Sequence, residues 1–146
     1  MAITTNAIAN SFKKELLEAN HDFTQTSGDQ FKIALYTNSA TLGKSTTSFT
    51  TDHQVSNTGQ YTSGGGKLAK GSQQTSVASS VAIVDFADRS FTGVTLTARG
   101  ALIYNTSNSN TAVAVLDFGG DKTATAGTFT IQFPAFTTSA AILRIS

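Results

Sequence analysis

The chain of 146 residues contains no cysteine, no tryptophan, one proline and one methionine. Without cysteine it has neither disulfides nor thiolate metal ligands, which suits synthesis in a reducing cytoplasm. Only 13% of the residues are charged, and the ten basic residues are scattered, so we expect no nucleic-acid partner. No apolar run is long enough to cross a membrane, and the first residues lack the order of a secretory signal. We therefore expect a soluble protein that keeps its first residues.

Serine and threonine are abundant, at about 40 residues, and the net charge is only +1. A free, solvated monomer normally carries more charge, so this composition indicates surfaces that pack against neighbours. The length predicts a single domain over residues 1–146 that is large enough to bury a core without disulfides or metals.

One helix is predicted, over residues 6–19. Apolar side chains recur there at the spacing of one helical face, at Ile8, Phe12, Leu16 and Ala19. Thr5 or Asn6 can cap its start, and Asn20 can take the left-handed conformation at its end. We expect this helix to pack on a sheet, with docking on a partner as the alternative.

The rest of the chain has the pattern of β-strands. Phe31–Tyr36 alternates apolar and polar residues and predicts a half-buried strand. Six further strands are expected at Val81–Ala87, Phe91–Thr97 (with a bulge at Gly93), Ala101–Asn105, Ala112–Phe118, Thr128–Phe133 and Ala140–Ile145. Turns are expected at Asn105–Asn110, Gly119–Asp121 and Ala126–Gly127, and Pro134 should lie at a strand end.

About seven to nine short strands separated by turns predict a mainly β fold. We expect an antiparallel β-sandwich of the Greek-key or jelly-roll kind, with the N-terminal α-helix covering one open end or one face. Residues 37–80 are the least defined part, because they are rich in Ser and Thr and carry few apolar residues. They predict either short edge strands near 53–61 and 67–78 or a long loop that becomes ordered only against a partner.

Two short motifs suggest chemistry and fail closer inspection. Gly64-Gly65-Gly66-Lys67 resembles a phosphate loop, but Tyr61 and Leu68 stand where that motif requires glycine and a hydroxyl residue. A flexible hairpin tip is the better interpretation. Asp117-Phe118-Gly119 spells the kinase metal-binding triplet without any accompanying kinase motif. We expect Asp117 to cap local amides at a glycine turn instead.

No catalytic, cofactor-binding or metal-binding residue can be assigned from the sequence. His21 and His53 are the only histidines, and no G-x-S-x-G elbow or other activated nucleophile accompanies them, so we expect surface or loop histidines. Asp85, Asp88, Asp117 and Asp121 could hold a hard cation, but their spacing does not resemble a calcium loop. Arg99 or Arg89 could instead pair with Asp85 or Asp117, and a structural salt bridge is the role that we expect for Arg99.

Several stretches give the chain its resemblance to a family of small structural proteins from tailed bacteriophages. They are GDQFKIALYTNSATL (28–42), TARGALIYN (97–105), AVLDFGGDKTA (114–124) and ILRI (142–145), together with Thr4-Thr5-Asn6 and Ser11-Phe12-Lys13 near the start. The likeness spans nearly the whole chain and is weakest over residues 43–80. These stretches are sheet and turn sequences without catalytic signatures.

The resemblance implies a virion component without enzymatic activity, and most specifically a capsid cement (decoration) protein that binds and stabilises the major capsid protein from outside. Such a protein is made in the host cytoplasm and resides on the capsid surface. We expect it to self-associate, with a trimer favoured on symmetry grounds and monomers and dimers left open. The segment before the helix and residues 43–80 are expected to make many of its inter-chain contacts.

Two alternatives stay open beside the cement protein. One is a tail or baseplate component, and the other is a receptor-binding β-domain in which Tyr36, Tyr61 and Tyr104 stack on sugars, although the absence of Trp counts against stacking. A small hydrolase is less favoured still, because no acid, base and nucleophile can be named together.

Overall fold

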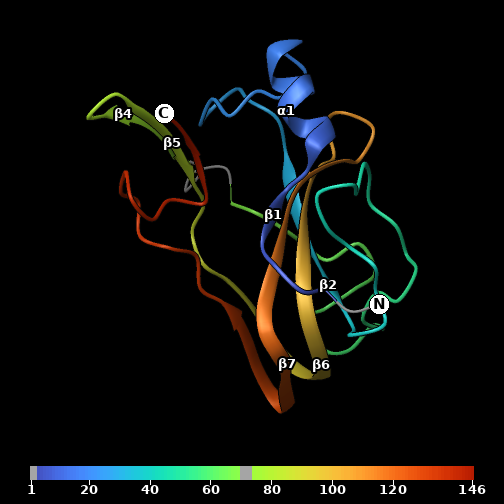
Figure 1. The fold of residues 1–146 in the computed structure, drawn as a ribbon. Coiled ribbons are helices and arrows are strands. Elements are labelled where there is room, and N and C mark those ends of the chain that lie inside the picture. Colours follow the sequence, from blue (N-terminus) through green and yellow to red (C-terminus); the bar gives the residue numbers. More distant parts are fainter. Residues whose placement is uncertain (1–2, 70–73) are drawn as a thin grey trace.

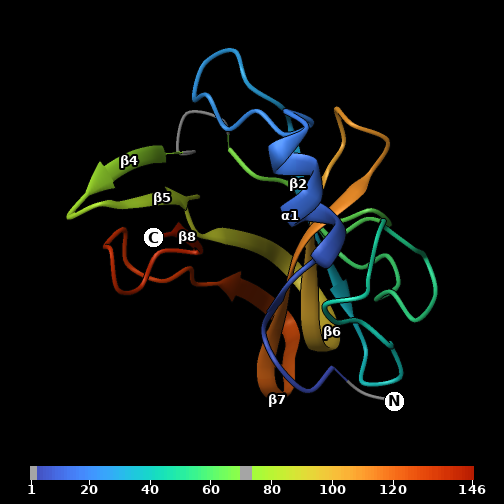
Figure 2. The same cartoon turned by 45° about the horizontal axis from the view of Figure 1, so that its top comes forward.

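A computed structural model describes residues 3–69 and 74–146 of the chain. Its strands form two antiparallel sheets with one short helix, α1 (Asn10–Leu17), so the predicted mainly β class is confirmed. The five-stranded sheet has the order β1 (Ala7–Ile8), β7 (Thr111–Ile131), β6 (Arg89–Asn105), β2 (Phe31–Tyr36) and β3 (Gly66–Lys67). The three-stranded sheet has the order β4 (Gln74–Ala78), β5 (Val81–Asp85) and β8 (Leu143–Ile145). The small sheet stands to one side of the large one, whereas the loops between β2 and β3 lie on the other side (Figures 1 and 2).

The long hairpin β6–β7 dominates the large sheet. The sequence predicts separate strands over these segments, and this is wrong, because residues 89–105 and 111–131 are each one continuous strand. The expected turns at Gly119–Asp121 and Ala126–Gly127 lie inside β7, where Gly119 and Ala126 have positive φ values of 75° and 46°. Bulges, including the predicted one beside Gly93, let both strands bend back on themselves instead of ending (Figure 1). The predicted hairpin tip is confirmed, since β6 and β7 are joined by residues 106–110.

The helix is shorter than the predicted range 6–19. Ala7 and Ile8 pair with Val115 and Ala114 as an edge strand, and the helix begins only after them. Neither Thr5 nor Asn6 caps it, because Ala9 is the N-cap and no side chain bonds there. At the other end, Ala19 rather than Asn20 takes the left-handed conformation, with φ of 58°.

The other predicted strands are confirmed only in part. β2 has the predicted bounds, but it is buried on both faces instead of being half-buried, because Ala34 and Tyr36 are fully covered. The expected edge strand at 53–61 forms only isolated bridges. The edge strand expected at 67–78 is divided into β3 and β4, and residues 70–73 lie outside the described residues. The strands predicted at Val81–Ala87 and Ala140–Ile145 are shorter than expected, as β5 and β8. Pro134 follows the end of β7 as expected.

The segment between β2 and β3 packs on the chain's own core. Tyr61 and Leu68 are at most 2% exposed, and the backbone amides of Val55 and Leu68 donate to the carbonyls of Leu35 and Phe31, each at 2.9 Å. Up to Leu68, the segment predicted at residues 37–80 therefore packs against the chain's own core, residues 70–73 lie outside the described residues, and order without a partner stays a prediction. A few large side chains, spaced widely along the segment, are enough to hold it against β2.

A row of aromatic rings connects the helix with both sheets. Phe12 of α1 meets Phe23 edge to face at 6.0 Å, and Phe23 stacks on Phe31 of β2 at 4.6 Å. Phe31 in turn contacts Phe86, which follows β5. Aromatic pairs in these geometries add to the free energy of burial. This row fixes α1 at a set position relative to the small sheet, and a groove lies between the two.

Candidate functional site: a groove between the helix and the small sheet

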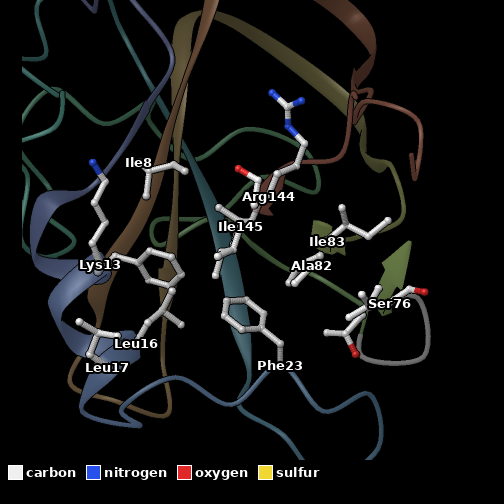
Figure 3. Close-up of a pocket in the computed structure, with 16 residues that line it drawn as sticks. Ile8, Lys13, Leu16, Leu17, Phe23, Ser76, Ala82, Ile83, Arg144 and Ile145 are labelled. Atoms are coloured by element: carbon white, nitrogen blue, oxygen red, sulfur yellow. The ribbon is translucent and has the colours of Figure 1, made fainter. Parts of the chain in front are cut away.

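An apolar groove of about 730 Å³ separates α1 from the three-stranded sheet (Figure 3). Phe12, Leu16 and Leu17 of α1 form one wall, and Phe23 contributes to the floor. Residues from all three strands of the small sheet form the other wall. A gap of this volume falls in the range of roughly 300–1,000 Å³ that is usual for ligand sites.

Strand register explains why the small sheet presents an apolar wall. Directly paired residues of antiparallel strands share a face of the sheet. Val77 pairs with Ala82, Ala82 pairs with Ile145, and Val84 pairs with Leu143. These five side chains therefore share one face, and Figure 3 shows Ile145 between the helix side chains and β5.

The exposed large hydrophobic side chains of the described residues lie at this groove. Leu17, Val77 and Ile145 are 92%, 72% and 60% exposed, and within residues 3–69 and 74–146 they are the large hydrophobic side chains that remain exposed. All three line this groove. Scattered exposed apolar residues are normal in soluble proteins, but a contiguous set marks a surface used for contact.

Two basic residues are among the lining residues. Lys13 and Arg144 border the groove, and Figure 3 shows both long side chains reaching away from the apolar floor. Arg144 donates through Nη1 to the carbonyl oxygens of Thr138 and Ser139, at 3.3 and 2.9 Å. No Asp or Glu side chain is among the lining residues that the structure describes. Because Arg144 pairs with Ile83, its side chain lies on the sheet face opposite Ile145 and Leu143, and the groove itself is an apolar trough.

The histidine nearest the helix is part of a buried polar network. His21 lies in the loop between α1 and β2, one of the two positions expected for the histidines, but its side chain is fully covered. Its Nε2 lies 2.7 Å from Glu15 Oε2, and its Nδ1 lies 3.0 Å from Asn105 Nδ2. Because the Asn105 amide is a donor, Nδ1 accepts and the ring carries its proton on Nε2, which donates to Glu15. The network holds the helix to the end of β6 and leaves His21 no nucleophile to activate.

His53 lies where it was expected, whereas the tyrosines are placed where they cannot stack on sugars. His53 is exposed in a loop, with φ of 59°, as expected. Tyr36, Tyr61 and Tyr104 are at most 3% exposed, so they cannot stack on sugars. Burial raises the pKa of the Tyr36 and Tyr61 hydroxyls and raises the pKa of Tyr104 to about 12. Their hydroxyls satisfy backbone groups instead, as when Leu35 N–H donates to Tyr61 at 2.8 Å.

The four aspartates of the C-terminal half do not converge. Asp88 accepts from Phe133 N–H at 2.8 Å, and Asp121 accepts from Asn38 at 3.1 Å. Burial raises the pKa of Asp85, and its Oδ1 has no hydrogen-bond partner among the described residues. In the part of the chain that the structure covers, no three His, Asp or Glu side chains come together as metal ligands. The cation-site alternative therefore has no support from this geometry.

The arginines have the structural roles that the sequence suggests, with one difference. Arg99 pairs with Asp117 as expected, through its Nε at 3.3 Å from Oδ1, and the same Nε donates to Ile3 O at 3.1 Å. Asp117 also caps the local amide of Gly119 at 2.9 Å, as expected. Arg89 does not pair with a carboxylate; its guanidinium lies over the Phe91 ring, 5.0 Å from the centroid. These contacts fasten the hairpin to its neighbours.

The Gly64-Gly65-Gly66 segment is not the flexible hairpin tip that the sequence predicts. Gly64 O accepts from the Tyr104 hydroxyl at 2.6 Å, and Gly66 pairs with Ile33 in β3. Gly65 has φ of 75°, and a Cβ atom there would lie 1.8 Å from Ile33 O. The glycines let the chain lie against β2, so their role is a close backbone approach.

Comparison of the chain with protein-family models, with curated proteins and with solved structures finds no match. The groove is thus identified from geometry. Sequence reasoning missed it because its walls come from three distant segments, residues 8–23, 75–84 and 143–146. The one local signal is Leu17, an apolar residue that lies beside the predicted face of Ile8, Phe12, Leu16 and Ala19 and widens it. No helix in the described ranges has the length and apolar character needed to span a bilayer.

Proposed function

We propose that this chain is a virion structural protein of a tailed bacteriophage, of the capsid cement kind, which binds the outside of the shell and stabilises it. The observation that carries a binding role is the groove between α1 and the small sheet, which gathers the exposed large hydrophobic side chains of the described residues. The resemblance of residues 28–42, 97–105, 114–124 and 142–145 to phage structural proteins supports the choice of partner.

A catalytic role finds no support in the side chains that could perform chemistry. His21 is closed in a network with Glu15 and Asn105, and the buried tyrosine hydroxyls bond the backbone. A nucleophile, its base and a cleft that unites them are needed for hydrolysis. The function proposed is therefore binding to other proteins, without enzymatic activity.

Mass action explains how such a protein would stabilise the capsid shell. A protein that binds the assembled shell and not the dissociated subunits shifts the equilibrium toward the shell, by an amount that grows with its concentration relative to Kd. Because many copies bind one particle, a modest contact for each copy adds up over the shell. The partners proposed are the major capsid protein and further copies of this chain, with a trimer as the favoured oligomer. The location proposed is the outer surface of the capsid, after synthesis in the host cytoplasm.

Copy number in purified particles tests the proposal. Quantitative mass spectrometry should find this chain at hundreds of copies per particle. A handful to a few dozen copies would favour the tail or baseplate component instead. Absence from the particle would overturn the virion role altogether.

Shell stability gives an independent test of the cement role. Particles produced without this chain should open at a lower temperature than complete particles, and addition of the purified protein should restore the difference. Equal opening temperatures with and without the protein would contradict cement action even if the copy number is high.

A further inference from the structure

We propose that the free edge of β3 binds an extended, acidic segment of the major shell protein, with one carboxylate of that segment directly opposite Lys67. This rests on the proposed function and adds to it a contact surface that shares no residue with the groove, together with the chemistry of its partner. Two features carry the inference. One is a pair of like charges without an acid, and the other is a set of backbone groups without a partner.

The like charges are two lysines of neighbouring strands. Lys32 of β2 and Lys67 of β3 are directly paired in the antiparallel ladder, so their side chains leave the same face of the sheet. Like charges directly opposite one another destabilise a sheet. Neither ammonium has a hydrogen bond or an ion pair among the described residues, where the ion pairs involve Lys14, His21 and Arg99. The sheet therefore keeps a repulsive pair for which it holds no acid.

The register brings the two lysines close and leaves the backbone of Lys67 free. Leu68 N–H donates to Phe31 O at 2.9 Å. Because the two kinds of antiparallel pair alternate, the next pair, Lys67 with Lys32, is the kind without hydrogen bonds, in which side chains lie closer together. The N–H and C=O groups of Lys67 then point away from β2. β3 is the last strand of its sheet, so these two groups are open to an added strand.

A third cation lies on the other face of β3. Successive residues of a strand point to opposite faces, and a Cβ atom added to Gly66 would lie 2.5 Å from Arg89 Nε. The Arg89 guanidinium lies over the Phe91 ring at 5.0 Å, and its Nε has no hydrogen-bond partner among the described residues. Positive charge therefore flanks this short strand on both faces, and no carboxylate of the described residues pairs with it.

An acidic segment in extended conformation fits both features. The residue of an added strand that lies opposite Lys67 has its side chain on the face of Lys32 and Lys67. An Asp or Glu there meets two ammonium groups at once and replaces repulsion by attraction. Nucleic acid fits less well, because it needs a basic stripe along many phosphates, whereas β3 has two residues. Two copies of this chain joined edge to edge through β3 would bring four lysines together.

The binding test uses particles purified without this chain and the labelled full-length protein, measured by co-sedimentation over a range of concentrations. Lys32→Gln combined with Lys67→Gln should weaken binding about tenfold and reduce its dependence on salt. Lys44→Gln combined with Lys122→Gln removes the same charge at two exposed positions and should bind like the unmodified protein. Circular dichroism of each variant checks that it folds.

The outcomes separate the two proposals. If the unmodified protein does not sediment with the particles, the cement role fails, and this inference fails with it. If it binds and the Lys32 and Lys67 variant binds equally well, the cement role stands and the edge of β3 is not the contact.

Stability of the isolated protein tests the like-charge pair without any partner. Lys67→Glu places an acid opposite Lys32, so it should raise the melting temperature by about 2–4 °C at low salt while it weakens binding to particles. Lys44→Glu makes the same charge change away from this pair and should shift the melting temperature by less than about 1 °C. An unchanged or lower melting temperature for Lys67→Glu would overturn the inference.

Competition and crosslinking identify the occupant. A peptide of alternating Glu and Thr should displace the bound protein at lower concentrations than oligothymidylate of equal charge or inorganic phosphate of equal ionic strength, and the reverse order would overturn the choice of a protein segment. A photo-crosslinking residue at the exposed Ala69 should capture a peptide of the major shell protein that contains Asp or Glu. Crosslinks only to other copies of this chain, or none on bound particles, contradict it.

Discussion

At the scale of single residues, buried polar side chains such as Asn105 form hydrogen bonds with the backbone and with one another. Asn105 is fully buried and donates through one amide nitrogen to Asp29 at 2.6 Å and to His21 at 3.0 Å, while its oxygen accepts from Ser107 N–H at 2.9 Å. Each partner would be left without a bond in a low-dielectric site if the amide were removed. Such networks are costly when they are only partly satisfied.

Asn105→Leu should therefore destabilise the protein by about 2–4 kcal/mol, since the shape is nearly kept but several buried partners lose their bonds. Urea unfolding measures the change as a lower midpoint at an unchanged slope. Asn38→Ala is the matched control, because Asn38 is exposed and its bond to Asp121 lies at the surface; it should change stability by less than about 0.5 kcal/mol. Equal effects of the two variants would contradict the role assigned to Asn105.

The tyrosines predict a loss of stability at alkaline pH. Burial raises the pKa of Tyr104 to about 12, and it raises the pKa of Tyr36 and Tyr61 above the ordinary 10.0. Above pH 10 the unfolded chain releases these protons while the folded chain keeps them, so the unfolded state binds fewer protons and the free energy of unfolding falls as pH rises. Below pH 10 the tyrosines do not alter stability with pH.

We expect a fall of up to about 1.4 kcal/mol per pH unit for each tyrosine between pH 10 and about 12. Urea unfolding at several pH values measures it, and tyrosinate absorbance should appear together with unfolding. Tyr104→Phe should reduce the slope of the free energy of unfolding against pH by the contribution of one tyrosine. Tyrosinate absorbance that rises near pH 10 in a protein that remains folded would contradict burial of these hydroxyls.

At the scale of elements, β2 is the strand on which the rest of the large sheet depends. It pairs with β6 along its whole length, from Phe31 with Asn105 to Tyr36 with Gly100, and with β3 on its other side. The glycine segment before β3 lies so close that a side chain has no room there. This close approach secures the loop between β2 and β3.

Gly65→Ala should destabilise the protein by more than about 3 kcal/mol, because its Cβ would lie 1.8 Å from Ile33 O at a φ of 75°. Gly43→Ala is the matched control in the same segment: nothing lies within 4 Å of its added Cβ, and its φ is not positive. That variant should be as stable as the original or more stable by about 0.5 kcal/mol. Thermal unfolding compares the two, and similar melting temperatures would show that Gly65 is not pressed against β2.

At the scale of the whole molecule, the segment from β2 to β3 packs against the rest of the chain. The amides of Val55 and of Leu68, just after β3, donate to Leu35 and Phe31 of β2, and the amide of Phe49 donates to Asn110 in the hairpin tip, each at 2.9 Å. Residues 43–69 can still contact neighbours on a shell, but they would do so as a preformed surface. Preformed surfaces lose less conformational entropy when they bind.

Hydrogen exchange on the isolated protein should therefore show strong protection at Val55, Leu68 and Phe49. The comparison is with amides of β2, whose protection reports global unfolding, so the two sets should exchange at rates within about a hundredfold. If these amides exchange at the rate of an unfolded chain while β2 is protected, the segment becomes ordered only against a partner.

The sequence by itself determined the class of the fold, because strand signals are local. The strand at Phe31–Tyr36, the hairpin tip at 106–110 and the bulge beside Gly93 each follow from residues within a few places of one another, and each is confirmed, although β2 is buried on both faces. The expected partners of Arg99 and the capping by Asp117 also held, since both depend on the same hairpin.

Only the tertiary structure decided where strands continue, which polar groups are buried and where the apolar surface remains open. Gly119 and Ala126 have the positive φ of turn residues, yet β7 continues on both sides of them because β6 pairs with the residues that flank each position. His21 is buried because β6 ends beside the helix, and the groove exists because residues 8–23, 75–84 and 143–146 converge. Local preference sets the conformation of each segment, but burial and contact depend on segments that are far apart in the chain.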